Sequence, residues 1–113
     1  MSARSSKAKG RRLQNFVRDA LRKIYKTLED DDIKSQTMGM TGEDIVLSPA
    51  AQKKIPFSFE CKNQEKLNIW KSLEQTEKNA PKSRQPVLIF TRNQKPVYVT
   101  QRFEDWCKNN LGE

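Results

Sequence analysis

The sequence contains no histidine at all. This absence excludes a serine–histidine triad, a histidine general base and a zinc site with imidazole ligands. It has only two cysteines, Cys61 and Cys107, and their separation does not match a metal-binding motif. We expect both to be free thiols in a reducing, cytoplasmic environment. Any catalysis by this chain must therefore depend on carboxylates, lysine and a metal ion.

Long hydrophobic runs are also missing. No stretch approaches the roughly 20 apolar residues of a membrane-spanning helix, and the N-terminal region lacks the apolar core of a signal peptide. We therefore expect a cytoplasmic protein without a membrane partner. At 113 residues the chain forms one domain at most. Because a domain of this size buries a modest core, dimer formation would help it.

Charge is unevenly divided, with 22 basic and 14 acidic residues and a formal net charge of +8. Such an excess indicates a polyanionic partner, and nucleic acid is the usual one. Residues 1–9 are rich in Ser, Ala and Lys and lack apolar periodicity. We expect them to form a flexible basic arm, either a solvated tail or a strap along phosphates. Residues 10–113 then form the single folded domain.

Hydrophobic periodicity predicts an α/β fold. Apolar residues recur at helical spacing over 10–28, and a continuous apolar run at 86–90 is typical of a strand buried on both faces. The predicted order is helix, three strands, helix, two strands, helix, which gives a mixed sheet of about five strands flanked by helices. The further strands are predicted at 33–37, 44–47, 55–62 and 97–99, and the further helices at 67–79 and after Thr100.

The central stretch 42–62 carries the candidate chemistry. Asp44 opens one short apolar run, and Glu60 and Lys62 close the next. Because side chains alternate along a strand, Glu60 and Lys62 share one face. The other face carries Phe57, Phe59 and Cys61, which we expect in the core. A hairpin between the two runs would bring Asp44 beside Glu60. Two convergent carboxylates suit a hard divalent cation such as Mg²⁺.

These segments resemble the PD-(D/E)xK nuclease superfamily. The resemblance is carried by Gly-Glu-Asp-Ile-Val at Gly42, by Phe-Glu-Cys-Lys-Asn at Phe59 and by the helix from Trp70 to Gln75. The basic Lys-Gly-Arg-Arg start of the first helix and the small size resemble archaeal-type and phage Holliday junction resolvases. The similarity runs from Lys7 to about Trp106. It implies a restriction-endonuclease-like core of αβββαββα order.

The resemblance also implies roles for single residues. Asp44, Glu60 and the main-chain carbonyl of Cys61 would bind the metal, Lys62 would be the catalytic lysine and Gln75 a supporting residue. The expected DNA contacts are Lys7, Lys9, Arg11, Arg12, Gln14 and Lys71. Two positions depart from the pattern. Gln14 falls near a first-helix glutamate of the resolvases, and Glu43 replaces the usual proline before Asp44, from which alternation points it away.

The implied function is hydrolysis of a DNA phosphodiester with Mg²⁺, or Mn²⁺ in its place, and no small-molecule cofactor. The first expectation is a homodimeric, phage-type Holliday junction resolvase acting in recombination and leaving a 5′-phosphate and a 3′-hydroxyl. The alternatives are a sequence-specific homing or nicking endonuclease on the same fold, and a non-catalytic DNA-binding protein. Trp70, Phe103 and Trp106 are candidates for dimer packing, with burial in the core as the alternative.

Overall fold

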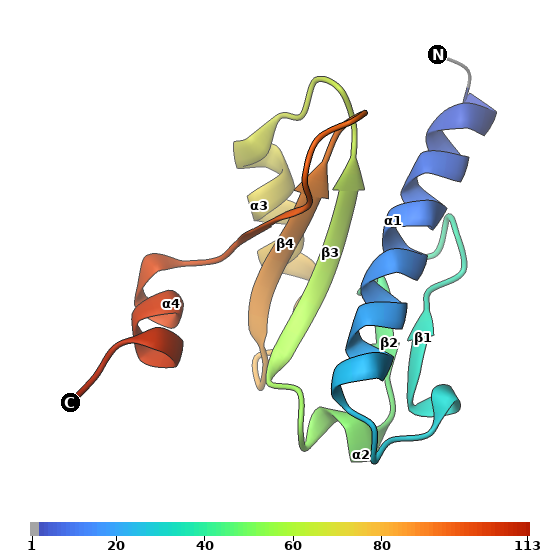
Figure 1. Cartoon of the computed structure of the whole chain (residues 1–113). Coiled ribbons are helices and arrows are strands. Elements are labelled where there is room, and N and C mark those ends of the chain that lie inside the picture. The colour runs from blue at the N-terminus through green and yellow to red at the C-terminus, as the bar shows by residue number, and fades with distance from the viewer. Residues whose placement is uncertain (1–2) are drawn as a thin grey trace.

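The computed structural model describes residues 3–113, which form four α-helices and five strands (Figure 1). The predicted order of the main elements is confirmed, with two short helical additions. In chain order the elements are α1 (Ala3–Ile24), the 3-10 helix η1 (Asp30–Asp32), β1 (Ile33–Ser35), β2 (Ile45–Leu47), α2 (Pro49–Gln52), β3 (Phe57–Asn63), α3 (Ile69–Asn79), β4 (Gln85–Thr91), β5 (Tyr98–Thr100) and α4 (Phe103–Asn110). The protein is therefore of the expected α/β class.

The strands divide into two sheets rather than the single mixed sheet that we expected. β1 and β2 are antiparallel, with Ile33 opposite Leu47. β3 and β4 are parallel, and β5 adds antiparallel to β4. A parallel pair needs a crossover connection, and α3 supplies it. The two sheets meet where the N–H of Asp44 donates to the carbonyl of Phe59, at 3.0 Å.

The predicted hairpin between β2 and β3 is therefore wrong. After β2 the chain enters α2, where Ser48 is the N-cap and accepts a hydrogen bond from Ala51 N–H at 3.2 Å. Pro49 occupies the first helical position, where its fixed φ favours helix and its missing N–H costs nothing. This helical turn redirects the chain, so that β3 pairs with β4 instead of folding back on β2.

One face of β3 and β4 packs against α1 and forms the main core. Its buried members are Leu13 and Val17 from α1, Phe59 and Cys61 from β3, and Val87 and Ile89 from β4, joined by residues of β1, β2 and α2. The predicted core face of β3 is thus confirmed at Phe59 and Cys61. Leu88, also fully buried, belongs to the opposite face of β4. The run at 86–90 is accordingly buried on both faces, as predicted.

The opposite face of β3 is covered by α3, which lies behind β3 and β4 in Figure 1. The buried residues of α3 are Ser72 and Thr76, whereas Trp70, for which core burial was one of the two expectations, is 75% exposed. These small side chains let the helix approach the sheet closely. Each hydroxyl donates to the carbonyl four residues earlier, at 2.8 and 2.7 Å, so neither is left unsatisfied.

The two chain ends also differ from expectation. Residues 3–9, which we assigned to a flexible arm, are part of α1, while Met1 and Ser2 lie outside the described residues. Lys9 anchors this end of the helix, since its carbonyl accepts a hydrogen bond from the Asn63 amide at 3.0 Å. At the other end α4 stands away from the sheets (Figure 1), and none of its described residues is buried. Phe103 and Trp106 are therefore not core residues. Within 3–113, no helix combines the length and the apolar character that crossing a membrane requires.

Candidate active site

Asp44 and Glu60 converge although the expected hairpin does not form. Asp44 immediately precedes β2, and its Oδ2 accepts a hydrogen bond from Cys61 N–H at 2.7 Å. Its own N–H donates to the Phe59 carbonyl at 3.0 Å. These two bonds bracket Glu60 on β3, so they fix Asp44 beside it. The position of Asp44 is therefore set by two main-chain groups of β3, the Cys61 N–H and the Phe59 carbonyl.

The pair lies in a largely dry environment. Glu60 is 4% exposed, and its Oε2 accepts a hydrogen bond from Asn79 Nδ2 of α3 at 3.3 Å. Burial, and then the neighbouring Asp44 carboxylate, raises the pKa of Glu60 to about 7 against the opposing effects of Asn79 and Lys62. Burial also raises the pKa of Asp44, while Cys61 N–H and the Lys62 charge act in the opposite direction. Two acids forced together in this way favour a bound cation.

A cavity of about 560 Å³ opens onto the pair. It is bounded by α1, the loop 37–42, the end of β3 and the face of α3. The predicted site residues that line it are Lys7, Gln14, Asp44, Glu60, Cys61, Lys62 and Gln75. Residues from four separate parts of the chain therefore meet where the nuclease resemblance places metal, catalytic and DNA-binding groups.

Two residues that line this cavity, Gln14 and Asn63, each have a buried amide oxygen without a partner among residues 3–113. Gln14 is 5% exposed, and within residues 3–113 its Oε1 has no hydrogen-bond partner. The buried Oδ1 of Asn63 is likewise unpartnered in the described part of the chain. A buried polar atom without a partner is costly, so each oxygen needs a ligand or a water molecule. Gln14 lies near the first-helix position where the resolvases have a glutamate.

The donors fit a hard divalent cation. Among residues 3–113 no group of three His, Cys, Asp or Glu side chains is placed to hold a metal. A cation between the two carboxylates would need further donors, and the cavity offers the unpartnered Gln14 amide oxygen, the main chain of Cys61 and room for water. All of these donors are oxygen atoms, as Mg²⁺ prefers, and Mg²⁺ commonly uses one or two carboxylates and keeps several waters.

Lys62 completes the chemical arrangement. It follows Glu60 by two positions on β3, is half-buried and lines the cavity. Its ammonium group can therefore donate to a phosphate oxygen or to a water held beside the acids. Cys61 lies between Glu60 and Lys62 in sequence, and its side chain belongs to the core face of β3. Burial, reinforced by Asp44 and Glu60, raises the pKa of its thiol, so the sulfur stays protonated at neutral pH.

Some residues of the cavity escaped sequence reasoning. Lys78 and Asn79 line it together with Gln75. The stripe from Lys71 to Gln75, continued by steps of three and four, would have identified both. No sequence signal distinguishes Asn63, because its position depends on the packing of β3 against α1.

Other predicted contacts lie elsewhere. Lys9 is buried, and its Nζ forms an ion pair with Glu65 at 3.3 Å, so it is not free to contact DNA. Arg11 and Arg12 are exposed on α1, and Lys71 is exposed near the start of α3. Within the described chain these three stay outside the cavity lining. They are surface cations beside the site and not members of it.

Glu43 has a structural role that the sequence did not reveal. It points away from Asp44, as alternation predicted, and forms a buried ion pair with Arg84, which follows α3. Arg84 also donates to the Phe57 carbonyl at 3.2 Å. The ion pair therefore links Glu43 to the start of β3. The nucleases that the chain resembles have a proline at the position of Glu43.

Comparison with known proteins identifies the family of the chain. The model of the family described as "Phage putative PDDEXK endonuclease" matches residues 5–112. No curated protein and no solved structure matches the chain significantly. The family match spans almost the whole chain, and it includes both acids, the lysine and the supporting helix. The predicted membership of the PD-(D/E)xK superfamily is thus confirmed, and the chain belongs to the phage PDDEXK endonuclease family.

Proposed function

We propose that the protein is a metal-dependent endonuclease that hydrolyses phosphodiester bonds in DNA. Membership of the endonuclease family supports a hydrolytic nuclease. The observation that carries the proposal is the convergence of Asp44 and Glu60 beside Lys62 in one cavity. The net charge of +8 favours a polyanionic substrate.

The metal would be held by Asp44, Glu60, the Gln14 amide oxygen and the Cys61 carbonyl. We propose Mg²⁺, with Mn²⁺ as an alternative because it accepts the same oxygen donors. Such an ion, when bound, polarises the phosphate and lowers the pKa of a coordinated water. Since burial raises the pKa of Glu60, an ion at this position would also favour the ionised form of that acid.

The chain's own residues position the reacting groups. Cys61 N–H fixes one carboxylate and Asn79 the other, so the acids need little rearrangement. Lys62 donates to the attacking water or to a non-bridging phosphate oxygen, where negative charge develops. Gln75 supports this arrangement from α3. In line with the family resemblance, we propose products with a 5′-phosphate and a 3′-hydroxyl.

DNA would approach along the first helix. Lys7 lines the cavity, and Arg11 and Arg12 follow on the exposed surface of α1. Lys71 adds a cation from α3. Contacts of this kind are made to phosphates, so they fix the position of the duplex and make binding dependent on salt.

We further propose that two copies act together on a four-way junction inside the host cell. A two-fold dimer suits a substrate with two symmetric cleavage positions. Large apolar side chains are exposed near β5 and α4, including Trp70 at 75%, Phe103 at 76% and Trp106 at 44%. Exposed apolar clusters mark interaction surfaces. These are the residues that we considered for dimer packing from the sequence.

The test is a cleavage assay in Mg²⁺ that compares a four-way junction, a linear duplex and a flap. Cleavage of the junction alone supports a resolvase. Cleavage of the duplex at one sequence identifies a homing or nicking endonuclease. DNA binding without cleavage of any substrate identifies a non-catalytic binding protein and overturns the proposal. Asp44→Asn serves as the matched control, since it should bind each DNA without cutting it.

A further inference from the structure

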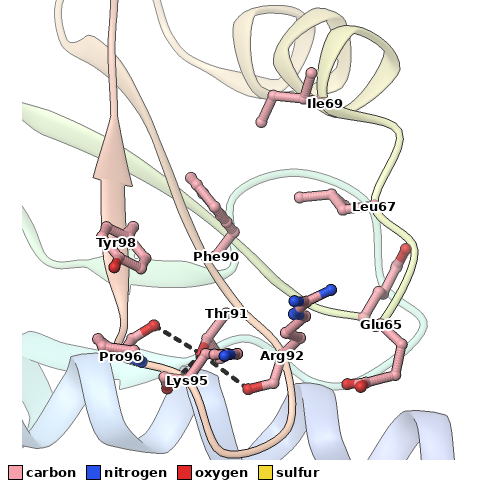
Figure 2. Close-up of a pocket in the computed structure, with 10 residues that line it drawn as sticks. Glu65, Leu67, Ile69, Phe90, Thr91, Arg92, Lys95, Pro96 and Tyr98 are labelled. Atoms are coloured by element: carbon pink, nitrogen blue, oxygen red, sulfur yellow. Dashed lines mark hydrogen bonds between the residues drawn. The ribbon is translucent and has the colours of Figure 1, made fainter.

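Figure 2 shows a second pocket, of about 480 Å³. It shares the lining residue Gln64 with the active-site cavity. Its walls are mainly apolar. Figure 2 shows Phe90 and Tyr98 on one side and Leu67 and Ile69 on the other, with Arg92 reaching in from the turn below. Its volume falls within the range of about 300–1,000 Å³ that is usual for small-molecule sites. The pocket is thus a slot with aromatic and aliphatic walls and a basic rim.

The strand register places this pocket beside Lys62. Lys62 on β3 is opposite Phe90 on β4, and Phe90 is opposite Tyr98 on β5. Side chains that are opposite one another in adjacent strands lie on the same face, with strands about 4.8 Å apart. Gln64 lines both the pocket and the active-site cavity. The slot therefore begins one strand away from the proposed catalytic lysine.

The rim of the pocket is braced. Thr91 Oγ1 lies 2.9–3.2 Å from three carbonyl oxygens of the turn 92–96. Glu65 Oε2 accepts a hydrogen bond from Asn93 N–H at 2.7 Å. The same oxygen accepts a hydrogen bond from the Lys9 ammonium of α1 at 3.3 Å. The charge of Glu65 is therefore already compensated. The turn is held against the helix that borders the active site, so the slot exists before any ligand enters it.

We propose that this slot receives one unstacked nucleobase of the bound DNA, next to the phosphate that is cleaved. The inference rests on the proposed nuclease function and adds one feature of its DNA substrate: at the cleavage position, one base leaves the stack. A base has two apolar faces, which match the Phe90 and Tyr98 rings and the Leu67 and Ile69 wall. The cations Arg92 and Lys95 are placed for the flanking phosphates. Enzymes that act on nucleic acids use such slots to hold bases outside the stack.

A protein segment is the competing occupant. The chemistry of the rim favours DNA, because Arg92 and Lys95 border an apolar pocket that shares Gln64 with the proposed cleavage site. The rings of Phe90 and Tyr98 are already stacked on one another, with centroids 5.8 Å apart. Tyr98 is 54% exposed, so one of its faces is free of core packing. An incoming base would contact this aromatic pair on one side and the wall of Leu67 and Ile69 on the other.

The test compares binding of a fully paired duplex with binding of the same duplex carrying one unpaired 2-aminopurine, in the presence of a chelator. Fluorescence anisotropy gives both affinities, and 2-aminopurine emission reports whether the base leaves the DNA stack. The variants are Tyr98→Ala, Tyr98→Phe, which keeps the ring, and Val99→Ala on the opposite face of the same strand. Tyr98 is exposed, so its replacement should leave the fold intact.

We expect the wild type to prefer the unpaired substrate and Tyr98→Ala to reduce that preference about 5- to 100-fold, while Tyr98→Phe and Val99→Ala preserve it. Equal affinity of the wild type for both duplexes would overturn the inference, as would an unchanged preference in Tyr98→Ala. Cleavage in Mg²⁺ is measured separately. Cutting without any preference refutes the base slot alone, whereas a preference without any cutting refutes the proposed nuclease function alone.

Discussion

Asp44 Oδ2 accepts a hydrogen bond from the main-chain N–H of Cys61 at 2.7 Å, across a sequence separation of 17 residues. This bond joins the residue before β2 to the middle of β3, which belongs to the other sheet. It therefore determines where one acid lies relative to the other. The proposed chemistry depends on this relationship, which can be tested at both of its ends.

Asp44→Asn should show the effect of the Asp44 charge on cleavage without a change in the stability of the fold. The amide oxygen can still accept from Cys61 N–H, so the melting temperature should change little, while cleavage in Mg²⁺ should fall a hundredfold or more because a charged ligand is lost. Asp44→Ala should lose the same activity and also about 1–3 kcal/mol of stability, since it leaves the Cys61 N–H unpaired. Single-turnover cleavage and thermal denaturation measure the two effects. Wild-type cleavage by Asp44→Asn would exclude Asp44 as a ligand.

Glu60 should make the metal-free protein less stable as the pH rises. Its pKa is about 7 in the folded chain against an ordinary value of 4.5. Between these values the folded state holds a proton that the unfolded state has released. The free energy of unfolding should therefore decline from pH 4.5 to pH 7, by about 1–2 kcal/mol after allowance for solvent screening.

Urea denaturation in a chelator, with wild type and Glu60→Gln compared at each pH, measures this effect. Glu60→Gln cannot ionise and should lack that part of the decline. The comparison is needed because Asp32 and Glu65, whose hydrogen bonds lower their pKa, act in the opposite sense at lower pH. Identical pH profiles for the two proteins would show that Glu60 does not titrate in this range.

Gln14 should affect metal binding and stability in opposite directions. Its buried Oε1 has no partner within residues 3–113, so Gln14→Leu should leave the metal-free protein as stable as the wild type or more stable. The same change should weaken Mg²⁺ affinity about tenfold, while Gln14→Glu should strengthen it. Thermal shift against Mg²⁺ concentration reports both quantities, since a ligand of the folded state raises the melting temperature. Equal Mg²⁺ affinity in all three proteins would exclude Gln14 from the metal site.

Arg11 and Arg12 should contribute to the salt dependence of DNA binding. Each phosphate contact adds about 0.9 to the slope of log affinity against log salt, so the Arg11→Ala, Arg12→Ala double variant should reduce that slope by about 2. The control is Lys53→Ala with Lys54→Ala, two exposed cations next to α2. Anisotropy titrations at several salt concentrations give the slopes. An unchanged slope would remove both arginines from the interface.

The exposed side chains of α4 should hold the proposed dimer together. Phe103→Glu with Trp106→Glu should convert a dimer into a monomer without unfolding the chain, because none of the described α4 residues is buried. Ile24→Glu, an equally exposed apolar position on α1, serves as the control. Light scattering over a range of concentrations measures the mass. A wild-type protein that remains monomeric at the highest concentration would contradict the dimer proposal.

Local patterns were sufficient for the order of the main elements. The spacing of apolar residues predicted α1, and the continuous run at 86–90 predicted a strand buried on both faces. Alternation along the strand was also enough to place Glu60 and Lys62 on one face of β3. These features depend on neighbours within a few residues, which a single sequence displays directly. Asp44 was predicted beside Glu60 from a hairpin that does not form, and contacts between the two sheets bring it there instead.

Strand pairing could not be read in the same way. β2 and β3 are separated by a short polar link that fits a hairpin, yet the Ser48 cap and Pro49 start a helical turn instead. Parallel pairing of β3 with β4 depends on the return of α3 to the sheet. That return involves Ser72 and Thr76, which are not hydrophobic enough to mark a buried face. The burial of Lys9 could not be predicted for a similar reason, since its partner Glu65 lies 56 positions away in the sequence.

The junction between the two sheets has a consequence for how the enzyme would lose activity. Asp44 lies at the contact between the two sheets. A fluctuation that separates the sheets would therefore also separate Asp44 from Glu60, even while each sheet remains folded. Local separation of the two sheets, without global unfolding, would be enough to abolish the proposed activity. The hydrogen-exchange rate of the Cys61 amide would then report the fraction of molecules in which the two acids are close together. That hydrogen is protected from exchange while it is bonded to Asp44.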